Sequence, residues 1–218
     1  MANGGLAWLQ RFKLVFWDFD GVIKESVGVK GDAFRELFAA YGKPVAQAVV
    51  AHHFENGGMP RREKIMHALR HFAGIAPDAA VVDDLVARFG KLVQSKVVNS
   101  AWVPGAEALL KTNPFAQSFI LLTATPQQEI QWILDQLEIR GAFLSVFGSP
   151  VKKTDAMRAS LAQYGVAAKD AVFLGDSRSD LEAAAACGVE FVLRETGHAS
   201  DHFRDFGGRR IPDFAVGP

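Results

Sequence analysis

The stretch LVFWDFDGV, residues 14–22, constrains the fold of this chain more than any other part of the sequence. It begins as a short apolar run, which predicts a strand buried on both faces. Two aspartates at alternate positions, Asp18 and Asp20, follow the run, and Gly21 comes next. Because positions two apart in a strand share a face, we expect both carboxylates at the carboxyl end of the strand, in one crevice. The glycine allows the chain to turn sharply away.

Two carboxylates this close repel each other unless a cation neutralises them or one of them keeps a proton. Oxygen ligands of this kind suit Mg²⁺. One carboxylate could then attack as a nucleophile while the other transfers a proton. The alternative is that Asp18 and Asp20 only end a strand, because aspartate is common in turns. The short motif leaves both interpretations open, and the rest of the chain has to decide between them.

Apolar runs and helical stretches alternate along the second half of the chain. The runs cover residues 119–123, 143–147, 171–174 and 191–193, the last of which we take as the final strand. This alternation favours an α/β fold with a doubly wound parallel sheet. In such sheets ligands bind beyond the carboxyl ends of the strands, where the strand order reverses.

Residues 25–99 contain four helical stretches and no convincing strand, which predicts a helical domain inserted after the first strand. The remaining segments, residues 1–24 and 100–218, then form the core domain. We interpret residues 24–31 as a polar turn and hinge, and expect the first inserted helix to begin after Asp32 as its N-cap.

Polar residues also follow the later apolar runs. They are Thr123, the pair Lys152 and Lys153, and Asp176 with Asp180 four residues on. Each has an ordinary explanation as a strand-end hydroxyl, a solvated lysine or a helix cap. Together, at the ends of successive parallel strands, they provide the charge neutralisation and positioning that phosphoryl transfer requires.

With these residues in this order, the sequence resembles the haloacid dehalogenase-like phosphatase superfamily over nearly its whole length, in the phosphoglycolate-phosphatase and β-phosphoglucomutase-like branch that carries a helical cap. DFDGV at residues 18–22 and GDSRSD at residues 175–180 are specific matches, whereas Thr123 and Lys153 are supported only by order and spacing. The resemblance implies a Rossmann-like core. It sets aside dehalogenases and phosphonate-cleaving members, because both lack the second acidic residue that Asp20 provides here.

The resemblance also implies a role for each matched residue. Asp18 is the expected nucleophile and Asp20 the general acid and base, while Thr123 and Lys153 hold the transferring phosphoryl group; Lys153 is narrowly preferred to Lys152. Mg²⁺ is expected at Asp18, the backbone carbonyl of Asp20, and Asp176, with Asp180 completing the site. The sequence departs from many relatives at Lys24 and Glu25, where we favour a solvated hinge lysine over one that faces the substrate.

The inserted segment has a candidate substrate-binding loop of its own, in which glycines precede a basic helix start. We expect it to bind an anionic part of the substrate, because helix starts and arginines both favour anions; a merely polar surface is the alternative. The candidate residues are Gly58, Arg61, Arg62 and Lys64, together with Ala124 at a strand end. A metal site at His52 and His53 is not expected, because adjacent helical residues do not converge on one ion.

The composition excludes several classes of partner. The chain has 218 residues, a formal net charge of zero and one cysteine, Cys187. We therefore expect no nucleic-acid or anionic-membrane surface, no intramolecular disulfide, and a cytoplasmic protein without a signal peptide or membrane span. The expected function is a Mg²⁺-dependent phosphatase for a small phosphorylated metabolite, acting through an aspartyl-phosphate as a monomer or weak homodimer. The alternatives are a phosphomutase acting on a sugar phosphate and a non-catalytic phospholigand-binding protein.

Overall fold

The computed structural model describes residues 5–197 and 201–215, so the extreme ends of the predicted core segments lie outside the described residues. Six parallel strands form one sheet in the order β3-β2-β1-β4-β5-β6. Their bounds are Leu14–Trp17, Ser118–Pro126, Ser145–Ser149, Ala171–Gly175, Glu190–Arg194 and Arg210–Ile211 for β1 to β6. The predicted doubly wound parallel sheet is confirmed. The order reverses between β1 and β4, which is where such folds bind ligands.

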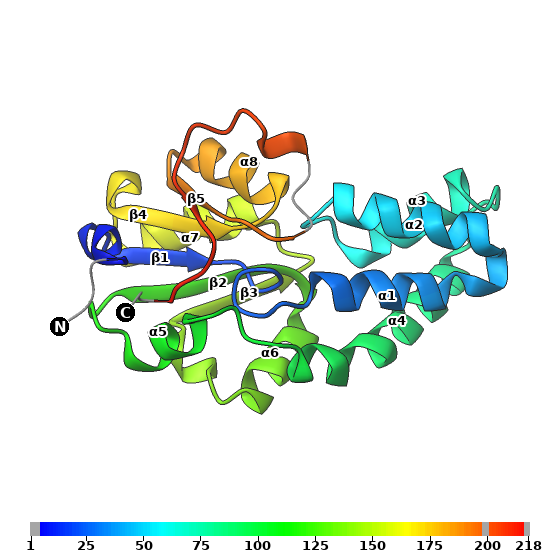
Figure 1. Cartoon of the computed structure of the whole chain (residues 1–218), viewed down its shortest axis with the longest axis horizontal. Helices are drawn as coiled ribbons and strands as arrows, with labels where there is room; N and C mark the ends of the chain where they lie inside the picture. The colour runs from blue at the N-terminus through cyan, green and yellow to red at the C-terminus, as the bar shows by residue number, and fades with distance from the viewer. Residues whose placement is uncertain (1–4, 198–200, 216–218) are drawn as a thin grey trace.

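Helices cover both faces of this sheet (Figure 1). Helices α5 (Ala106–Thr112) and α6 (Gln127–Gln136) pack on one face, and α7 (Lys153–Tyr164) and α8 (Arg178–Cys187) pack on the other. Short 3₁₀ turns lie at Ala7–Arg11, Ala39–Tyr41, Arg140–Ala142, Ala168–Asp170 and Asp201–Phe203.

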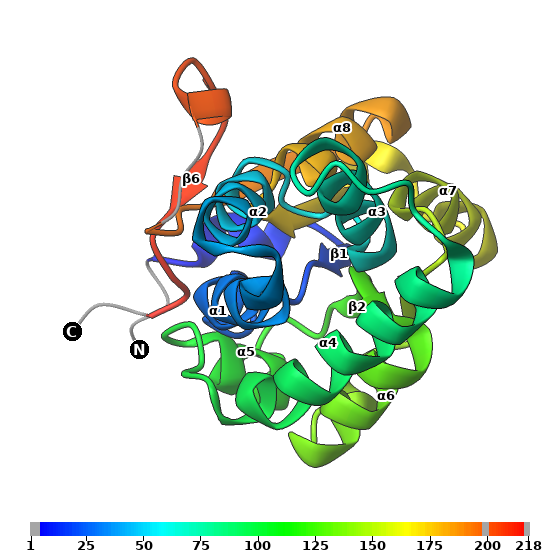
Figure 2. The ribbon, with the colours of Figure 1, turned by 90° about the vertical axis from the view of Figure 1, so that its right-hand side faces the viewer.

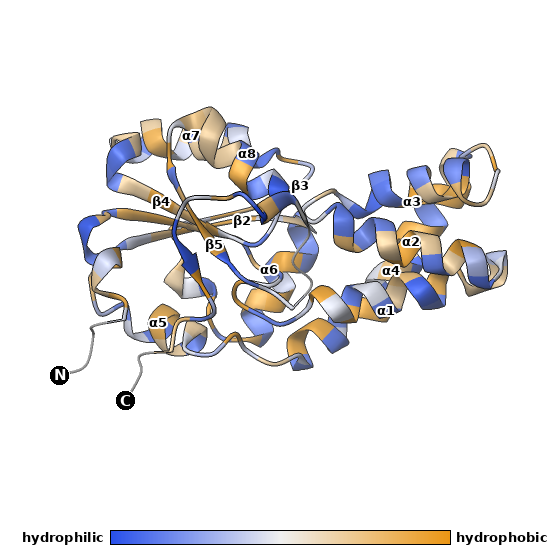
Figure 3. Cartoon of the chain, turned by 45° about the horizontal axis from the view of Figure 1, so that its top comes forward, coloured by the Kyte–Doolittle hydropathy of each residue, from blue (hydrophilic) through white to orange (hydrophobic). Residues whose placement is uncertain are grey.

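The side chains of β1 show why the sheet needs two helical layers. Val15 and Trp17 belong to the hydrophobic core on the α5–α6 side, whereas Leu14 and Phe16 belong to the core on the α7–α8 side. All four are fully buried. The strands accordingly form a mostly hydrophobic layer between the helices (Figure 3), as expected for a parallel sheet that is covered on both faces.

The segment between β1 and β2 forms four helices: α1 (Val27–Leu37), α2 (Lys43–Glu55), α3 (Arg61–His71) and α4 (Ala79–Asn99). We call α1–α4 the helical insert. It lies beyond the carboxyl edge of the sheet (Figures 1 and 2) and buries apolar side chains of its own, such as Phe34 and Phe89, whose ring centroids are 4.3 Å apart. Within the described part of the chain, no helix combines the length and apolar character needed to cross a membrane.

Three local expectations are wrong. Helix α1 begins at Val27 after Ser26, so Asp32 lies inside the helix, exposed and paired with Arg35. The first turn of α1 contains glycine, so helix propensity does not predict it. Tertiary packing outweighs helix propensity there. The run at residues 191–193 is not the final strand, since the two-residue β6 pairs with β5.

Lys24 is buried rather than solvated, with 2% of its surface exposed. Its ammonium donates to the Val98 carbonyl oxygen at 3.1 Å and lies 4.4 Å from the ring centroid of Trp102. The neighbouring Glu25 amide donates to the Ala101 carbonyl oxygen at 2.8 Å. The chain passes between the core and the helical insert twice, and these two connecting segments therefore lie side by side. The Lys24 side chain of the first segment contacts the second.

Candidate active site

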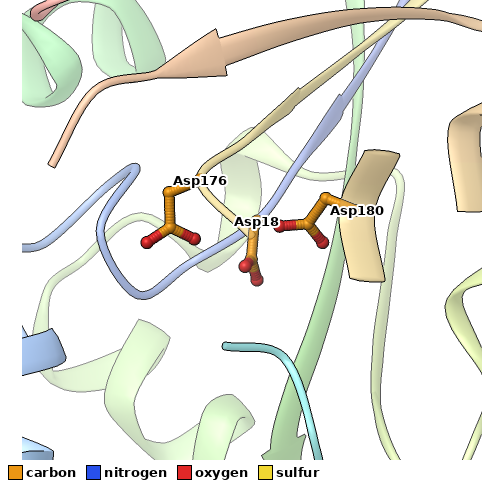
Figure 4. A group of neighbouring side chains, drawn as sticks. All are labelled: Asp18, Asp176 and Asp180. Atoms are coloured by element: carbon orange, nitrogen blue, oxygen red, sulfur yellow. The ribbon is translucent and has the colours of Figure 1, made fainter. Parts of the chain in front are cut away.

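Three carboxylates meet where the strand order reverses (Figure 4). Asp18 follows β1 and Asp176 follows β4, and these strands pair in register with Trp17 opposite Leu174. Asp180 lies in the first turn of α8. One oxygen from each carboxylate lies within 4.8 Å of the others. The parallel pairing of β1 and β4 thus brings together residues that are far apart in the sequence.

Two glycines make this close approach possible. Gly21 has a φ of +76°, and a Cβ atom there would lie 2.3 Å from Oδ2 of Asp176. A Cβ atom on Gly175 would lie 2.5 Å from the Cβ of Asp180. Neither position has room for a side chain while the carboxylates keep their places, so the glycines of both sequence motifs are structural requirements of the site.

Of the two candidate lysines, Lys153 is the one that reaches the carboxylates. Its ammonium lies 2.5 Å from Oδ1 of Asp180 and 3.1 Å from Oδ1 of Asp18, whereas Lys152 is exposed. Burial opposes its charge, but the Asp18 and Asp180 carboxylates outweigh burial and raise the pKa of Lys153. This lysine therefore provides a permanent positive charge beside Asp18.

One lysine does not neutralise three carboxylates. Burial, followed by the charge of Asp180, raises the pKa of Asp18 to about 8. Burial and the charge of Asp18 also raise the pKa of Asp176 well above its usual value. Groups of this kind favour a bound cation, and an all-oxygen donor set fits Mg²⁺.

Asp180 is held more firmly than the other two carboxylates. Its Oδ2 accepts hydrogen bonds from the Ser177 amide at 3.1 Å and from the Ser177 hydroxyl at 2.7 Å. The bond from the amide is one half of a capping box at the start of α8, in which the Ser177 side chain in turn accepts from the Asp180 amide. Oδ1 of Asp180 accepts from Lys153. These bonds fix Asp180 as the support on which Lys153 is positioned, whether or not it also contacts a cation.

Asp20 has a different environment from Asp18. Its carboxylate accepts from the Ser26 hydroxyl at 2.5 Å, the Lys30 ammonium at 2.5 Å and the Thr125 hydroxyl at 3.3 Å. Burial acts to raise the pKa of Asp20, but the charge and hydrogen bond of Lys30, with the Ser26 hydrogen bond, lower it overall. The second aspartate of the motif is therefore already paired with a cation from the helical insert.

A cavity lies between the carboxylates and the helical insert, with an empty volume of about 840 Å³ that includes space open to solvent. Of the predicted substrate-binding residues, Gly58, Arg61, Lys64 and Ala124 line it. Arg62 does not: its side chain is 48% exposed and pairs with Asp83 on α4. Consecutive residues on a helix point about 100° apart, and here Arg61 faces the cavity while Arg62 faces the surface beside α4.

Thr123 lies at the predicted strand end but outside the cavity lining. It is 1% exposed, and its hydroxyl oxygen accepts from the Thr125 amide at 3.2 Å. The lining at this strand end is formed by Ala124 and Thr125. Thr125 escaped sequence analysis although it follows Thr123 by two positions, the spacing that puts side chains on one side of a strand.

Lys30 and His53 also line the cavity and were not predicted. Lys30 lies one helical turn after Ser26, and both donate to the Asp20 carboxylate. That spacing was the available signal, but it is informative only once the helix is known to begin at Val27. His53 has no comparable local signal.

The helical insert and the core meet directly at Gly57 and Gly58. A Cβ atom on Gly58, which has a φ of +76°, would lie 1.8 Å from the Ser179 hydroxyl oxygen. A Cβ atom on Gly57 would lie 2.9 Å from the Cβ of Ser177. Gly58 therefore serves close packing between the insert and the loop after β4, in addition to lining the cavity.

Comparison with known proteins identifies the family to which this arrangement belongs. The family model for haloacid dehalogenase-like hydrolases matches residues 12–188, from just before β1 to just after α8. The chain belongs to the haloacid dehalogenase-like hydrolases. The match contains all three carboxylates and Lys153. The resemblance to this family is thus confirmed.

Several curated proteins are similar over most of the chain. A phosphoglycolate phosphatase of Pseudomonas savastanoi pv. phaseolicola is 29% identical over 194 residues, which cover 85% of this chain and 70% of the relative. A phosphorylated carbohydrates phosphatase of Thermotoga maritima is 29% identical over 196 residues, which cover 82% of each chain.

Solved structures share the fold over most of the chain. CbbY from Rhodobacter sphaeroides in complex with phosphate has a TM-score of 0.72 at 20% identity and covers 93% of this chain and 95% of its own. A predicted phosphoglycolate phosphatase from Haemophilus somnus has a TM-score of 0.77 at 18% identity, with 94% and 95% covered. At such identities the likeness concerns the fold, including the helical insert.

Proposed function

We propose that this hydrolase is a Mg²⁺-dependent phosphatase that cleaves small phosphomonoesters through an aspartyl-phosphate on Asp18. The observation that carries the proposal is the state of the two Asp18 oxygens. Oδ1 accepts from the Phe19 amide at 2.8 Å and lies 3.1 Å from the Lys153 ammonium, while no hydrogen bond within the described residues reaches Oδ2. One oxygen is thus fixed and the other is available to attack phosphorus.

In the first step, Oδ2 of Asp18 forms a bond to phosphorus as the bond to the leaving alcohol breaks, and Asp20 gives that alcohol its proton. In the second step, Asp20 takes a proton from water, and the water attacks phosphorus to release phosphate and restore Asp18. The low pKa of Asp20 suits the second step. For the first step Asp20 has to carry a proton. The negative charge of the bound phosphate opposes the effect of Lys30 on the pKa of Asp20, so Asp20 takes up a proton when the phosphate binds.

The remaining residues neutralise and position charge. Asp18, Asp176 and the backbone carbonyl of Asp20 would hold Mg²⁺, with Asp180 completing the site, and the ion would supply positive charge at the transferring phosphoryl group. Lys153 adds a second positive charge there, and the buried Thr123 hydroxyl supports the strand end that carries Ala124 and Thr125.

We also propose that residues 25–99 act as a cap that closes over the core formed by residues 1–24 and 100–218. The paired chain crossings at Lys24 and Ala101 support a hinge at this point. Gly58, Arg61, Lys64 and Ala124 contribute to binding a small phosphorylated metabolite; Arg62 lies outside this set. Two similar proteins are named as phosphatases of phosphoglycolate and of phosphorylated carbohydrates, which supports a substrate of this size.

The test is a screen of phosphorylated metabolites with Mg²⁺, in which free phosphate and isomeric products are both measured. Phosphate release that disappears with EDTA and in Asp18→Asn, with the fold of the variant intact by circular dichroism, is expected. Isomer formation without phosphate release would instead indicate a mutase. Ligand binding without any turnover would indicate a non-catalytic binding protein.

A further inference from the structure

Lys64 has no acidic partner among the described residues, although it is buried. It lies in the first turn of α3, lines the cavity and is 4% exposed. Within the described residues its ammonium forms hydrogen bonds only with His53, at 3.0 Å from Nδ1 and 3.3 Å from the carbonyl oxygen. A buried charge without a counter-charge is costly, so its presence in a cavity points to a ligand anion.

His53 orients this ammonium without neutralising it. Its Nε2 lies 3.1 Å from the Val27 carbonyl oxygen, which only accepts hydrogen bonds, so Nε2 carries the proton. Nδ1 then accepts from Lys64. Burial, followed by the charge of Lys64, lowers the pKa of His53 to about 3, so the ring stays neutral. Two of the three ammonium hydrogens are used by His53, and one is left for a ligand.

The other basic residues of the cavity are already paired. Arg61 lies 2.5 Å from Glu129 on α6 and stacks over the Phe89 ring, and the exposed Arg178 pairs with Glu182. Lys30 pairs with Asp20 and donates to the Thr125 hydroxyl at 2.9 Å. Among the described basic side chains that line the cavity, Lys64 is therefore the one whose charge is available to a ligand.

Lys64 lines the same cavity as Asp18, Asp20 and Asp176, so one bound molecule can contact both the lysine and the reaction centre. Burial, followed by the charge of Lys30, lowers the pKa of Lys64 to about 7, and the charges of Asp20 and Asp176 also act on it. The cavity thus has an acidic end at the strand tips and a basic end on the helical insert. The acidic Glu55 also lines it, but this residue is exposed, so water screens its charge.

We propose that Lys64, oriented by His53 and assisted by Lys30, binds a second anionic group of the substrate, a carboxylate or a second phosphate. The preferred substrates are then short phosphomonoesters that carry another negative charge near the ester. This inference rests on the proposed phosphatase function, and it assigns to Lys64 the part of the substrate that does not react.

The test compares three phosphomonoesters of similar length. Phosphoglycolate and ethylene glycol bisphosphate carry a second charged group and are the charged members; hydroxyethyl phosphate, the reference, carries no second charge. The wild-type protein should favour at least one charged member over the reference by about tenfold or more in kcat/KM, the size of one charged hydrogen bond. The charged member that is favoured distinguishes a carboxylate from a phosphate. In Lys64→Met the preference should fall towards one, mainly through KM, and Lys64→Arg should restore part of it.

Two controls separate this role from a structural one. Lys91→Met removes an exposed lysine of α4 and should keep the wild-type preference. The free Lys64→Met protein should melt at or above the wild-type temperature, because methionine fills the site without a buried charge; a lower melting temperature together with an unchanged preference would make Lys64 structural and overturn the proposal.

Binding measurements keep the inference testable if nothing is hydrolysed. Calorimetry with ethylene glycol bisphosphate, phosphoglycolate and hydroxyethyl phosphate should show tighter binding of a charged compound by wild type and not by Lys64→Met. Hydrolysis of all three compounds at equal efficiency would refute the second-anion site and leave the phosphatase proposal standing. Selective binding without hydrolysis would support the second-anion site and refute the phosphatase proposal.

Discussion

The two aspartates of the DFDG motif lie in opposite electrostatic environments, although one residue separates them. Asp18 is surrounded by carboxylates, and burial with the charge of Asp180 raises its pKa to about 8. Asp20 is paired with Lys30, which outweighs burial and lowers its pKa. The lack of a neutralising cation therefore raises the pKa of Asp18 and Asp176, whereas Asp20 is already neutralised by Lys30. The two predictions that follow at this scale depend on that difference.

The first prediction concerns pH and Mg²⁺. The pKa of Asp18 is higher in the folded protein than the value of 3.8 expected in the unfolded chain. Such a group stabilises the fold fully at a pH below 3.8, and this stabilisation is lost as the pH rises through about 8. Mg²⁺ binds the ionised form. The rise in melting temperature on adding Mg²⁺ should therefore increase between pH 6 and pH 8.5. Asp18→Asn should lose most of this increase, while the surface variant Asp84→Asn should keep it; a pH-independent Mg²⁺ effect would contradict the assignment.

The second prediction concerns the leaving group. Asp20→Asn removes the group that protonates the alcohol and then activates water. Nitrophenyl phosphate has a leaving group that needs little protonation, so its phosphorylation step should survive better than that of an alkyl phosphate. Rapid-quench measurement should show accumulated phosphoenzyme with the nitrophenyl ester. Equal losses with both esters would argue against Asp20 as the acid.

At the scale of elements, a pair of stacked histidines joins α2 to α3. The His52 and His67 rings are parallel within 3° and 4.1 Å apart. The Asn56 side-chain amide lies 2.9 Å from Nδ1 of His52, while the buried Nε2 of His52 has no hydrogen-bond partner in the described part of the chain. Burial, followed by the charge of His67, lowers the pKa of His52 to about 4. Neither ring accepts a proton readily while the two helices remain packed.

The third prediction is that acid weakens this helix pair. A histidine whose pKa is lowered by folding contributes stability above its unfolded value of about 6.5, and this is lost as the pH falls towards 4. The urea midpoint of wild type should therefore drop between pH 7.5 and pH 4.5. In His67→Phe, which keeps a ring in the stack and removes its charge, the drop should be smaller. His202→Gln, an exposed histidine outside the helical insert, serves as the control and should behave as wild type.

At the scale of the whole molecule, the position of the helical insert against the core depends on contacts with little tolerance. Arg61 of α3 pairs with Glu129 of α6, and both side chains are nearly buried, with 8% and 11% exposed. Gly58 packs against Ser179 with no space for a side chain. These contacts join the insert to α6 on one face of the sheet and to α8 on the other, so together they fix the position of the insert against the core.

The fourth prediction uses two glycines with similar backbones. Gly58 and Gly74 have φ values of +76° and +67°, but only at Gly58 would a Cβ atom meet the core. Alanine should cost each site roughly 1–2 kcal/mol of backbone strain. Gly58→Ala should also hold the insert away from the core, increase the radius of gyration in solution scattering and lower kcat/KM by about tenfold or more. The prediction fails if Gly74→Ala has the same effect on scattering and activity.

Much of the candidate site follows from local sequence. The apolar run before Asp18, the run before Asp176 and the rule that parallel strands end at one edge are sufficient to bring these carboxylates together. Lys153 was preferred to Lys152 only narrowly, and the structure separates them by their contacts: one lies 3.1 Å from Asp18 and the other is exposed. Adjacent side chains differ in direction, and direction depends on where the helix begins.

The sequence by itself determined the alternation of strands and helices up to β5, the parallel sheet and the carboxylates at its edge, because these depend on hydrophobic periodicity and on short motifs. Only the tertiary structure decided the partners of the charged residues in the helical insert. Lys24 became buried against Trp102, Arg62 turned to the surface, and Lys30 reached Asp20. Such contacts join segments whose spacing in the sequence is unrelated to their distance in space, and packing between helices selects which side chains face the cavity.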